Sequence, residues 1–275
     1  MPRALCISIF ILITCMVIGQ DNEFRGPAAA EKVLKTMFDR LYAEDSTGRE
    51  QAADQILEIM PVALSEPGAM EYPWDRLDRI GVITSEDNKI RLFTWHLETD
   101  PDNFRYFGYV QVALKRGRVK VFPLNDNGRP QRNLFDLEQS TGDWFGKLYY
   151  GIVMNREKRK KFYTVMGMDF NDSRSNIKSV EVLAIQRNRP VFMEKMFYNG
   201  NRQVDRLVLE YSDKVTISVR FEPNLEMITF DHLVPFHQVY TGNYEFYGPD
   251  GSHDGLEFSE GAWHFREDVD ARLQY

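Results

Sequence analysis

The fold is indicated most directly by the run Val215-Thr216-Ile217-Ser218-Val219-Arg220-Phe221. Apolar and polar side chains alternate along it with a period of two, which is typical of a β-strand with one buried face. Only Ser212, Asp213 and Lys214 separate it from the apolar run Leu207–Tyr211. A gap this short predicts a tight hairpin between two antiparallel strands.

The same period of two extends outward from this hairpin over most of the chain after about Ile80. Two further hairpins are predicted, joining Tyr106–Leu114 to Arg118–Phe122 and Leu256–Phe258 to Trp263–Phe265. Single strands are predicted at the other runs of this kind, which are Ile90–Leu97, Leu148–Met154, Phe162–Met168, Val180–Ile185, Phe192–Tyr198 and Met227–His232. In all, about thirteen strands are expected, joined mostly by short turns.

Consecutive hairpins favour an antiparallel meander, because parallel strands would need helical crossovers that this pattern lacks. A meander of this length can form a sandwich, close into a barrel, or divide into small sheets as in a propeller. The composition agrees with a mainly β fold, since 13% of the residues are aromatic and such side chains pack well on pleated sheets. We predict a single β-rich domain over residues 20–275.

A pair of helices is predicted ahead of the strands, forming a helical hairpin over about residues 27–62. From Pro27 to Tyr42, apolar side chains recur at steps of three and four residues, and Pro27 suits a first helical turn. The second helix is predicted to open with a capping box formed by Thr47 and Glu50. Pro61 is expected to disturb its end.

The first nineteen residues have the layout of a secretory signal peptide. Arg3 supplies a positive charge, Ala4–Ile18 is uncharged and mostly apolar, and Gly19 precedes an abruptly polar stretch. The apolar run is shorter than the roughly twenty residues that span a bilayer. We therefore expect cleavage after Gly19 or Gln20, export to the periplasm, the outer membrane or the extracellular space, and no transmembrane span afterwards. The alternatives are a retained anchor helix and lipidation at Cys15.

Charge and cysteine content argue against several functional classes. The formal net charge is −7, whereas a protein that binds nucleic acid needs a basic face. Both cysteines, Cys6 and Cys15, lie in the predicted signal peptide, so the remainder has no disulfide, thiolate zinc site or cysteine nucleophile. The most basic run, Arg156–Lys161, is interpreted as a solvated turn between strands, with contact to an anionic surface as the alternative.

Motifs that would identify an enzyme are absent from the sequence. It contains no GxSxG, GxGxxG or P-loop pattern, so no catalytic residue is assigned and no cofactor is predicted. Asp231 and His232 are not predicted to bind a metal together, because neighbouring side chains on a strand point to opposite faces. The run Gly248–Gly255 places Asp250 and Asp254 four residues apart. We interpret it as a turn, with an ion-binding or ligand-binding loop as the alternative.

Aromatic side chains near predicted loops are the best candidates for contact with a ligand. Trp95 and Trp263 lie on predicted strands and are expected in the core, whereas Trp144 and the Tyr240–Tyr247 segment lie near loops. Flat aromatic rings at such places can bind sugars or apolar ligands. The candidate ligand-binding residues are Trp144, Tyr240, Tyr247, Asp250 and Asp254.

Several stretches of the chain match a pattern of known proteins. They are Tyr72–Leu77, Ser85–Trp95, Tyr163–Asp169, Val180–Leu183, Ile228–Leu233 and Tyr247–Leu256. Together these stretches resemble an uncharacterised family of secreted or envelope proteins of Bacteroidetes-type bacteria, over most of the chain after the signal. Asn88 and Met168 stand where that pattern has Gly and Trp. The resemblance implies an envelope protein and carries no known activity.

These observations favour a non-catalytic envelope or extracellular module that binds a partner, a glycan or an apolar ligand through its loops. One alternative is a secreted hydrolase with two carboxylates as acid and base, which needs a pocket where they lie about 5–10 Å apart. Another is a structural component of envelope assembly, which would present a long exposed sheet edge.

Overall fold

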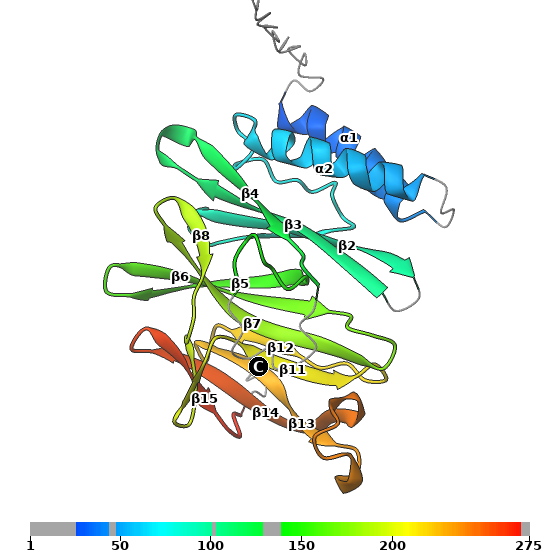
Figure 1. The fold of residues 1–275 in the computed structure, drawn as a ribbon. Helices are drawn as coiled ribbons and strands as arrows, with labels where there is room; N and C mark the ends of the chain where they lie inside the picture. The colour runs from blue at the N-terminus through cyan, green and yellow to red at the C-terminus, as the bar shows by residue number, and fades with distance from the viewer. Residues whose placement is uncertain (1–25, 44–47, 101–102, 129–138, 271–275) are drawn as a thin grey trace, which may run out of the picture.

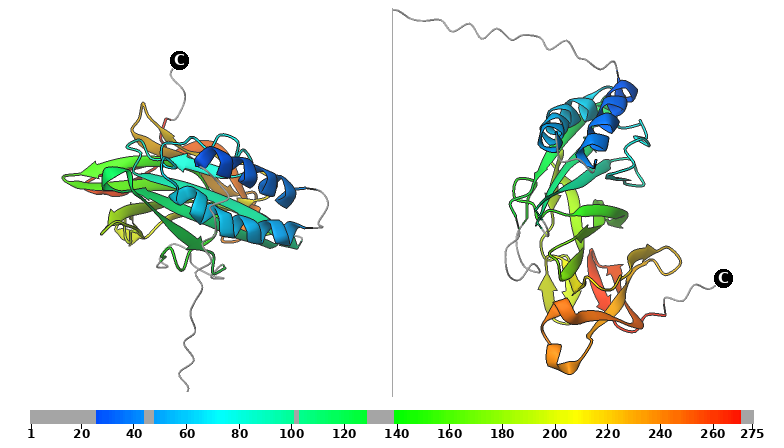
Figure 2. Two further views of the ribbon diagram at one scale, coloured as in Figure 1. Left: turned by 90° about the horizontal axis from the view of Figure 1, so that it is seen from above. Right: turned by 90° about the vertical axis from the view of Figure 1, so that its right-hand side faces the viewer.

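The computed structural model describes residues 26–43, 48–100, 103–128 and 139–270, so the predicted signal peptide lies outside it. Four layers are stacked in these residues: a pair of helices followed by three sheets of mostly antiparallel strands (Figure 1). The stack is elongated, with the helices at one end and the third sheet at the other (Figure 2). The prediction of a mainly β fold with an N-terminal pair of helices is confirmed. Neither helix in the described part of the chain has the length and apolar character of a membrane span.

The first sheet carries both helices on one of its faces. Its strands follow the order β1-β2-β3-β4, and the predicted hairpin around residues 115–117 is confirmed as β3 and β4. The bounds of these elements are α1 (Pro27–Leu41), α2 (Arg49–Ser65), β1 (Gly81–Thr84), β2 (Ile90–Asp100), β3 (Asn103–Ala113) and β4 (Val119–Asn125).

The second and third sheets contain the remaining strands. The second has the order β11-β7-β6-β5, with β8 also paired to β7, and the third has the order β10-β9-β15-β14-β13-β12. The second sheet comprises β5 (Leu148–Glu157), β6 (Lys160–Asp169), β7 (Ser175–Gln186), β8 (Arg189–Phe192) and β11 (Leu207–Ser212). The third comprises β9 (Phe197–Asn199), β10 (Arg202–Val204), β12 (Val219–Glu222), β13 (Met227–Pro235), β14 (Tyr247–Ser259) and β15 (Ala262–Arg266).

The prediction that Leu207–Tyr211 and Val215–Phe221 form a hairpin is wrong. β11 pairs with β7 in the second sheet, whereas β12 begins only at Val219 and pairs with β13 in the third sheet. A period of two determines which side chains are buried, but it does not select the strand that completes the hydrogen bonds. Residues 213–218 therefore carry the chain from one sheet to the next, with Ile217 buried between them.

The predicted strand Phe192–Tyr198 is likewise divided between two sheets. β8 ends at Phe192 in the second sheet, and β9 begins at Phe197 in the third. β9 then pairs parallel to β15, which departs from the all-antiparallel expectation. Apolar side chains continue across the crossing because they are buried between the two sheets, so the sequence pattern does not reveal the break.

Each gap between layers holds one hydrophobic cluster with at least one fully buried tryptophan. Trp95 packs between the helices and the first sheet, where its ring stacks on Phe107 at 5.6 Å. Trp144 lies between the first and second sheets, and Trp263 lies between the second and third. The predicted core positions of Trp95 and Trp263 are confirmed. Burial of these large rings supplies much of the free energy that holds the layers together.

The second helix begins at Arg49 and extends further than predicted at its other end. Gly48 is the residue that precedes the helix and supplies no side-chain cap; Thr47, the other half of the predicted capping box, lies outside the described residues. At the other end the helix continues through Pro61 to Ser65. A proline cannot donate to the carbonyl of Leu57, and the hydroxyl of Tyr109 donates to that carbonyl instead, at 3.2 Å. The first sheet thus compensates for the hydrogen bond that the helix loses.

Gly81 in β1 lies against β5 of the second sheet, so we predict that no larger residue fits at this position without strain. A Cβ at this position would lie 2.7 Å from the carbonyl oxygen of Tyr149 and 2.9 Å from Oγ1 of Thr94. We expect Gly81→Ala to lower the free energy of unfolding by about 1–3 kcal/mol, measured by denaturant titration. Gly142→Ala is the control, because the nearest atom there is 3.7 Å away. Equal stability of the two variants would contradict the close contact between the sheets.

Candidate functional site

Four of the five predicted ligand-binding residues lie on or beside one pair of neighbouring strands. β13 and β14 are antiparallel partners in the third sheet. Tyr240 lies in the connection between them, and Tyr247, Asp250 and Asp254 follow one another along β14. Trp144 is not part of this group, because it lies in the core between the first and second sheets.

The connection between β13 and β14 protrudes from the end of the third sheet. We call residues 236–246 the aromatic projection; it is drawn in orange at the lower right of Figure 1 and at the bottom of the right-hand view in Figure 2. Two short 3-10 helices, Gln238–Tyr240 and Tyr244–Phe246, shape it. Its base is closed by the amide of Phe236, which donates to the carbonyl of Phe246 at 2.9 Å.

Large apolar side chains are exposed on this projection. The exposed fractions are 51% for Phe236, 75% for Val239, 36% for Tyr240 and 49% for Tyr244. Few other large apolar side chains are this exposed in the described part of the chain. A cluster of exposed apolar groups on a folded protein commonly marks a surface that contacts another molecule.

The exposed rings are held by contacts within the projection, with β14 and with the second sheet. Tyr240 stacks on Phe246 at 4.2 Å between ring centroids, and the ring of Tyr244 lies 4.9 Å from that of Tyr247. The amide of Gly242 donates to the hydroxyl of Tyr247 at 2.9 Å. Glu245 forms an ion pair of 3.0 Å with Arg174, from the loop before β7. These contacts preorganise the surface for binding.

Two Asp–His pairs cross between β13 and β14 below the projection. Nδ1 of His232 lies 2.7 Å from Oδ2 of Asp254, and Nε2 of His253 lies 3.2 Å from Oδ1 of Asp231. Asp231 and His232 point to opposite faces of the strand, as predicted, so each of them belongs to a different pair. Among the residues described, no three His, Cys, Asp or Glu side chains are placed to hold a metal ion.

The interpretation of Gly248–Gly255 as a turn is wrong, because the whole run lies within β14. Its turn-forming residues produce a bulge: Asp231 pairs with His253 and Leu233 with Pro249, so three residues of β14 oppose one of β13. Gly251 adopts a φ of +95° there. Asp250 accepts hydrogen bonds from the amide and the hydroxyl of Ser252, and these bonds hold the pKa of Asp250 below its usual value.

We predict that the His232–Asp254 pair makes stability depend on pH. The hydrogen bond that His232 donates to Asp254 raises the pKa of His232 above its ordinary value of 6.5. Protonated His232 is thus favoured in the folded state, so its contribution is complete below pH 6.5 and is lost as the pH rises through the raised pKa. Asp254→Asn should bring the pKa of His232, measured by NMR titration, back towards 6.5. Titration of wild-type His232 at or below that value would contradict the pairing.

Trp144 does not face solvent, contrary to its selection as a ligand-binding residue. Its side chain is fully buried, and its indole N–H donates to the hydroxyl of Tyr149 at 3.1 Å. The chain around it looks loop-like in sequence because it forms only isolated bridges, such as that between Asp126 and Trp144. An irregular segment can still insert a large ring into the core when its backbone groups are paired.

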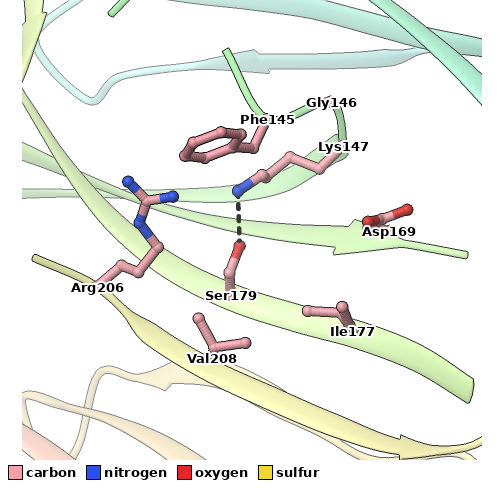
Figure 3. Close-up of a pocket in the computed structure, with 8 residues that line it drawn as sticks. All are labelled: Phe145, Gly146, Lys147, Asp169, Ile177, Ser179, Arg206 and Val208. Carbon is pink, nitrogen blue, oxygen red and sulfur yellow. Dashed lines mark hydrogen bonds between the residues drawn. The ribbon is translucent and has the colours of Figure 1, made fainter. Parts of the chain in front are cut away.

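A buried ionic cluster lies next to Trp144. Nζ of Lys147 lies 2.5 Å from Oε1 of Glu181 and 3.2 Å from Oγ of Ser179, the contact drawn in Figure 3. Nε of Arg206 lies 3.7 Å from the same oxygen of Glu181, and its guanidinium covers the ring of Phe145 at 4.9 Å. The three charged side chains come from different segments of the chain, so the cluster connects β7 to the residues that precede β5 and β11.

The environment of this cluster fixes its charges. Burial opposes ionisation of Glu181, but Lys147 and Arg206 outweigh that effect and keep the pKa of Glu181 below its usual value. Burial lowers the pKa of Lys147 against the opposing effect of Glu181. Burial and the neighbouring Glu181 together raise the pKa of Tyr149 well above 10. The adjoining cavity of about 20 Å³ has room for about one water molecule, so the cluster has a structural role.

The sequence indicates part of the exposed surface but not the buried ionic cluster. Tyr240 and Tyr247 were selected by their position near a loop, whereas Phe236 and Val239 were not distinguished from core residues. Glu181 does leave a signal, since a carboxylate within the apolar run Val180–Leu183 requires a buried partner. That signal does not identify Lys147 as the partner, because 33 other residues lie between them.

Comparison with known proteins adds no relative. No family of proteins, no curated protein and no solved structure matches this chain.

Proposed function

We propose that this protein is an exported, non-catalytic module of the bacterial envelope that binds another protein through its aromatic projection. The observation that carries the proposal is the group of exposed apolar side chains at Phe236, Val239, Tyr240 and Tyr244 on an ordered protrusion. The N-terminal sequence supports export, since Ala4–Ile18 has the character of a signal-peptide core.

The shape and chemistry of the projection favour a protein partner. Small ligands generally bind in concave sites, whereas the projection extends outward from its sheet (Figure 1). Tyrosine and phenylalanine are enriched at the centres of protein interfaces, where a few buried aromatic side chains supply most of the binding free energy. The stacking of Tyr240 on Phe246 holds part of this surface before binding, which reduces the entropy lost on association.

The acidic residues near the projection are arranged for structure and give little support to the hydrolase alternative. Asp250 accepts two hydrogen bonds from Ser252, and Asp254 accepts from His232 and from the amide of Asp268. The cavity beside the buried ionic cluster, lined by Lys147 and Arg206, is too small for a sugar. A binding role does not require the two neighbouring carboxylates that a hydrolase needs as acid and base.

Cysteine labelling tests this proposal, because the chain contains no cysteine after Cys15. Val239→Cys and Tyr244→Cys report on the projection. Val62→Cys and Leu225→Cys are matched controls, since those side chains are 43% and 40% exposed elsewhere. We expect the two projection cysteines to react with a maleimide several-fold more slowly in the native envelope fraction than in the purified protein. The two control cysteines should react equally in both.

Two outcomes would contradict this function. Equal labelling of the projection cysteines in both preparations would mean that nothing covers the projection. If the projection cysteines react slowly, and glycan digestion but not protease restores their reactivity, the surface would be assigned to a glycan. Protection that is removed by protease supports a protein partner.

A further inference from the structure

A second surface lies at the opposite end of β14 from the aromatic projection. An open cleft of about 760 Å³ is formed there by the turns of the β5–β6, β7–β8 and β14–β15 hairpins. These three turns gather on the left side of Figure 1. Thirteen residues of extended chain separate the two ends of β14, a distance of roughly 40 Å. The cleft is therefore separate from the projection.

The inner part of the cleft is apolar. Phe162 and Met196 are buried at its floor, and Met193 and Ile185 are half-buried along its wall. Methionine side chains are flexible and polarisable, so they adapt to the shape of an apolar ligand. A volume of this size lies in the usual range of ligand sites, about 300–1,000 Å³.

The rim of the cleft is cationic. Lys89, Arg159, Lys160 and Lys161 all line it. Lys161 forms an ion pair of 2.6 Å with Asp87, and the ammonium of Lys89 bonds to a backbone carbonyl. Arg159 and Lys160 are exposed and form no ion pair with any residue that the structure describes. The basic run Arg156–Lys161 covers the end of β5, the turn at residues 158–159 and the start of β6, and it supplies two available cations to the cleft.

We propose that this cleft binds a single-chain fatty carboxylate, with the alkyl chain on the apolar floor and the carboxylate beside Arg159 and Lys160. The cleft is complementary to both parts of such a ligand. A cationic rim on a protein of net charge −7 selects an anionic group, and the apolar side chains of Phe162, Met193 and Met196 select an apolar chain. A ligand with both parts satisfies the whole lining, whereas a phosphate alone would leave the apolar floor uncovered.

Dodecanoate is the probe for this site, titrated into the purified chain from Gln20 to Tyr275 below its micelle concentration and followed by calorimetry. Dodecanol and dodecyltrimethylammonium carry the same chain with neutral and cationic heads, and acetate carries the head alone. We expect one dodecanoate per chain, at least tenfold weaker binding of the other three, and weaker dodecanoate binding at higher salt. Equal binding of the three long-chain probes would overturn the proposal. So would binding to anionic vesicles without binding of free dodecanoate.

Variants locate the binding within the chain. Arg159→Ala with Lys160→Ala should weaken dodecanoate binding several-fold, because each exposed charge pair contributes a factor of about 1.5–5. Arg118→Ala with Lys214→Ala removes the same number of exposed cations elsewhere and should leave binding unchanged. Met193→Glu places a carboxylate on the wall and should abolish binding while an unchanged melting temperature shows that the chain is folded. Unchanged binding in both cleft variants would overturn the assignment.

Discussion

Glu181→Gln is expected to lower the free energy of unfolding by about 3–5 kcal/mol. The substitution keeps the shape of the side chain and removes its charge, so Lys147 and Arg206 are left in the core without their anion. Breaking a buried ion pair costs more than the pair contributes, because the remaining charges cannot return to water. Equilibrium denaturation with urea, fitted to a two-state transition, measures the change.

Glu257→Gln is the matched control for this prediction. Glu257 pairs with Arg266 at 2.8 Å, but both side chains are about half exposed. Exposed pairs contribute at most about 1 kcal/mol, so this variant should differ little from the wild type. A change below about 1 kcal/mol for Glu181→Gln would mean that its cluster is hydrated. The structural role given to the cluster would then be wrong.

Trp263→Ala is expected to have a similarly large effect, about 3–5 kcal/mol. Trp263 is fully buried between the second and third sheets, and its ring packs against Phe258 at 5.2 Å. Its indole N–H donates to Oγ1 of Thr164 in the second sheet at 2.8 Å. Truncation therefore removes both apolar contact and a hydrogen bond between the layers. Denaturation monitored by circular dichroism gives the loss in free energy.

Two companion variants separate the causes of this effect. Trp263→Phe keeps most of the ring contact and removes the donor to Thr164, so its loss should be smaller than that of Trp263→Ala. Val239→Ala alters a side chain that is 75% exposed and should change stability by less than about 0.5 kcal/mol. If Trp263→Ala were as mild as Val239→Ala, the second and third sheets would not be packed through this residue.

The periodicity of the sequence predicts most of the helices and strands, but it does not predict which strands pair. Helical steps in residues 27–42 correspond to α1, and alternation in residues 227–232 corresponds to β13. The alternation in residues 215–221 was equally clear, yet it spans a crossing between two sheets. Because side chains on both sides of that crossing are buried in one shared core, burial alone does not reveal where pairing changes.

The candidate site was predictable only in part, because position near a loop is a weak guide to exposure. Tyr240 is in the aromatic projection, whereas Trp144 fills the core between two sheets. Turn-forming residues at Asp250 and Gly251 form a bulge within a strand rather than a reversal of the chain. In each case the outcome depends on contacts from distant segments, which the local sequence does not specify.

Photo-crosslinking from the aromatic projection is the most direct test of the proposed function. A benzophenone amino acid is placed at Tyr244 or Val239 in the projection, and at Leu225 or Val62 as controls, in the protein expressed in its native cells. The account predicts one discrete protein adduct of the same mass from both projection sites and none from either control site. Adducts of equal yield at all four sites, or none from the projection, would contradict it.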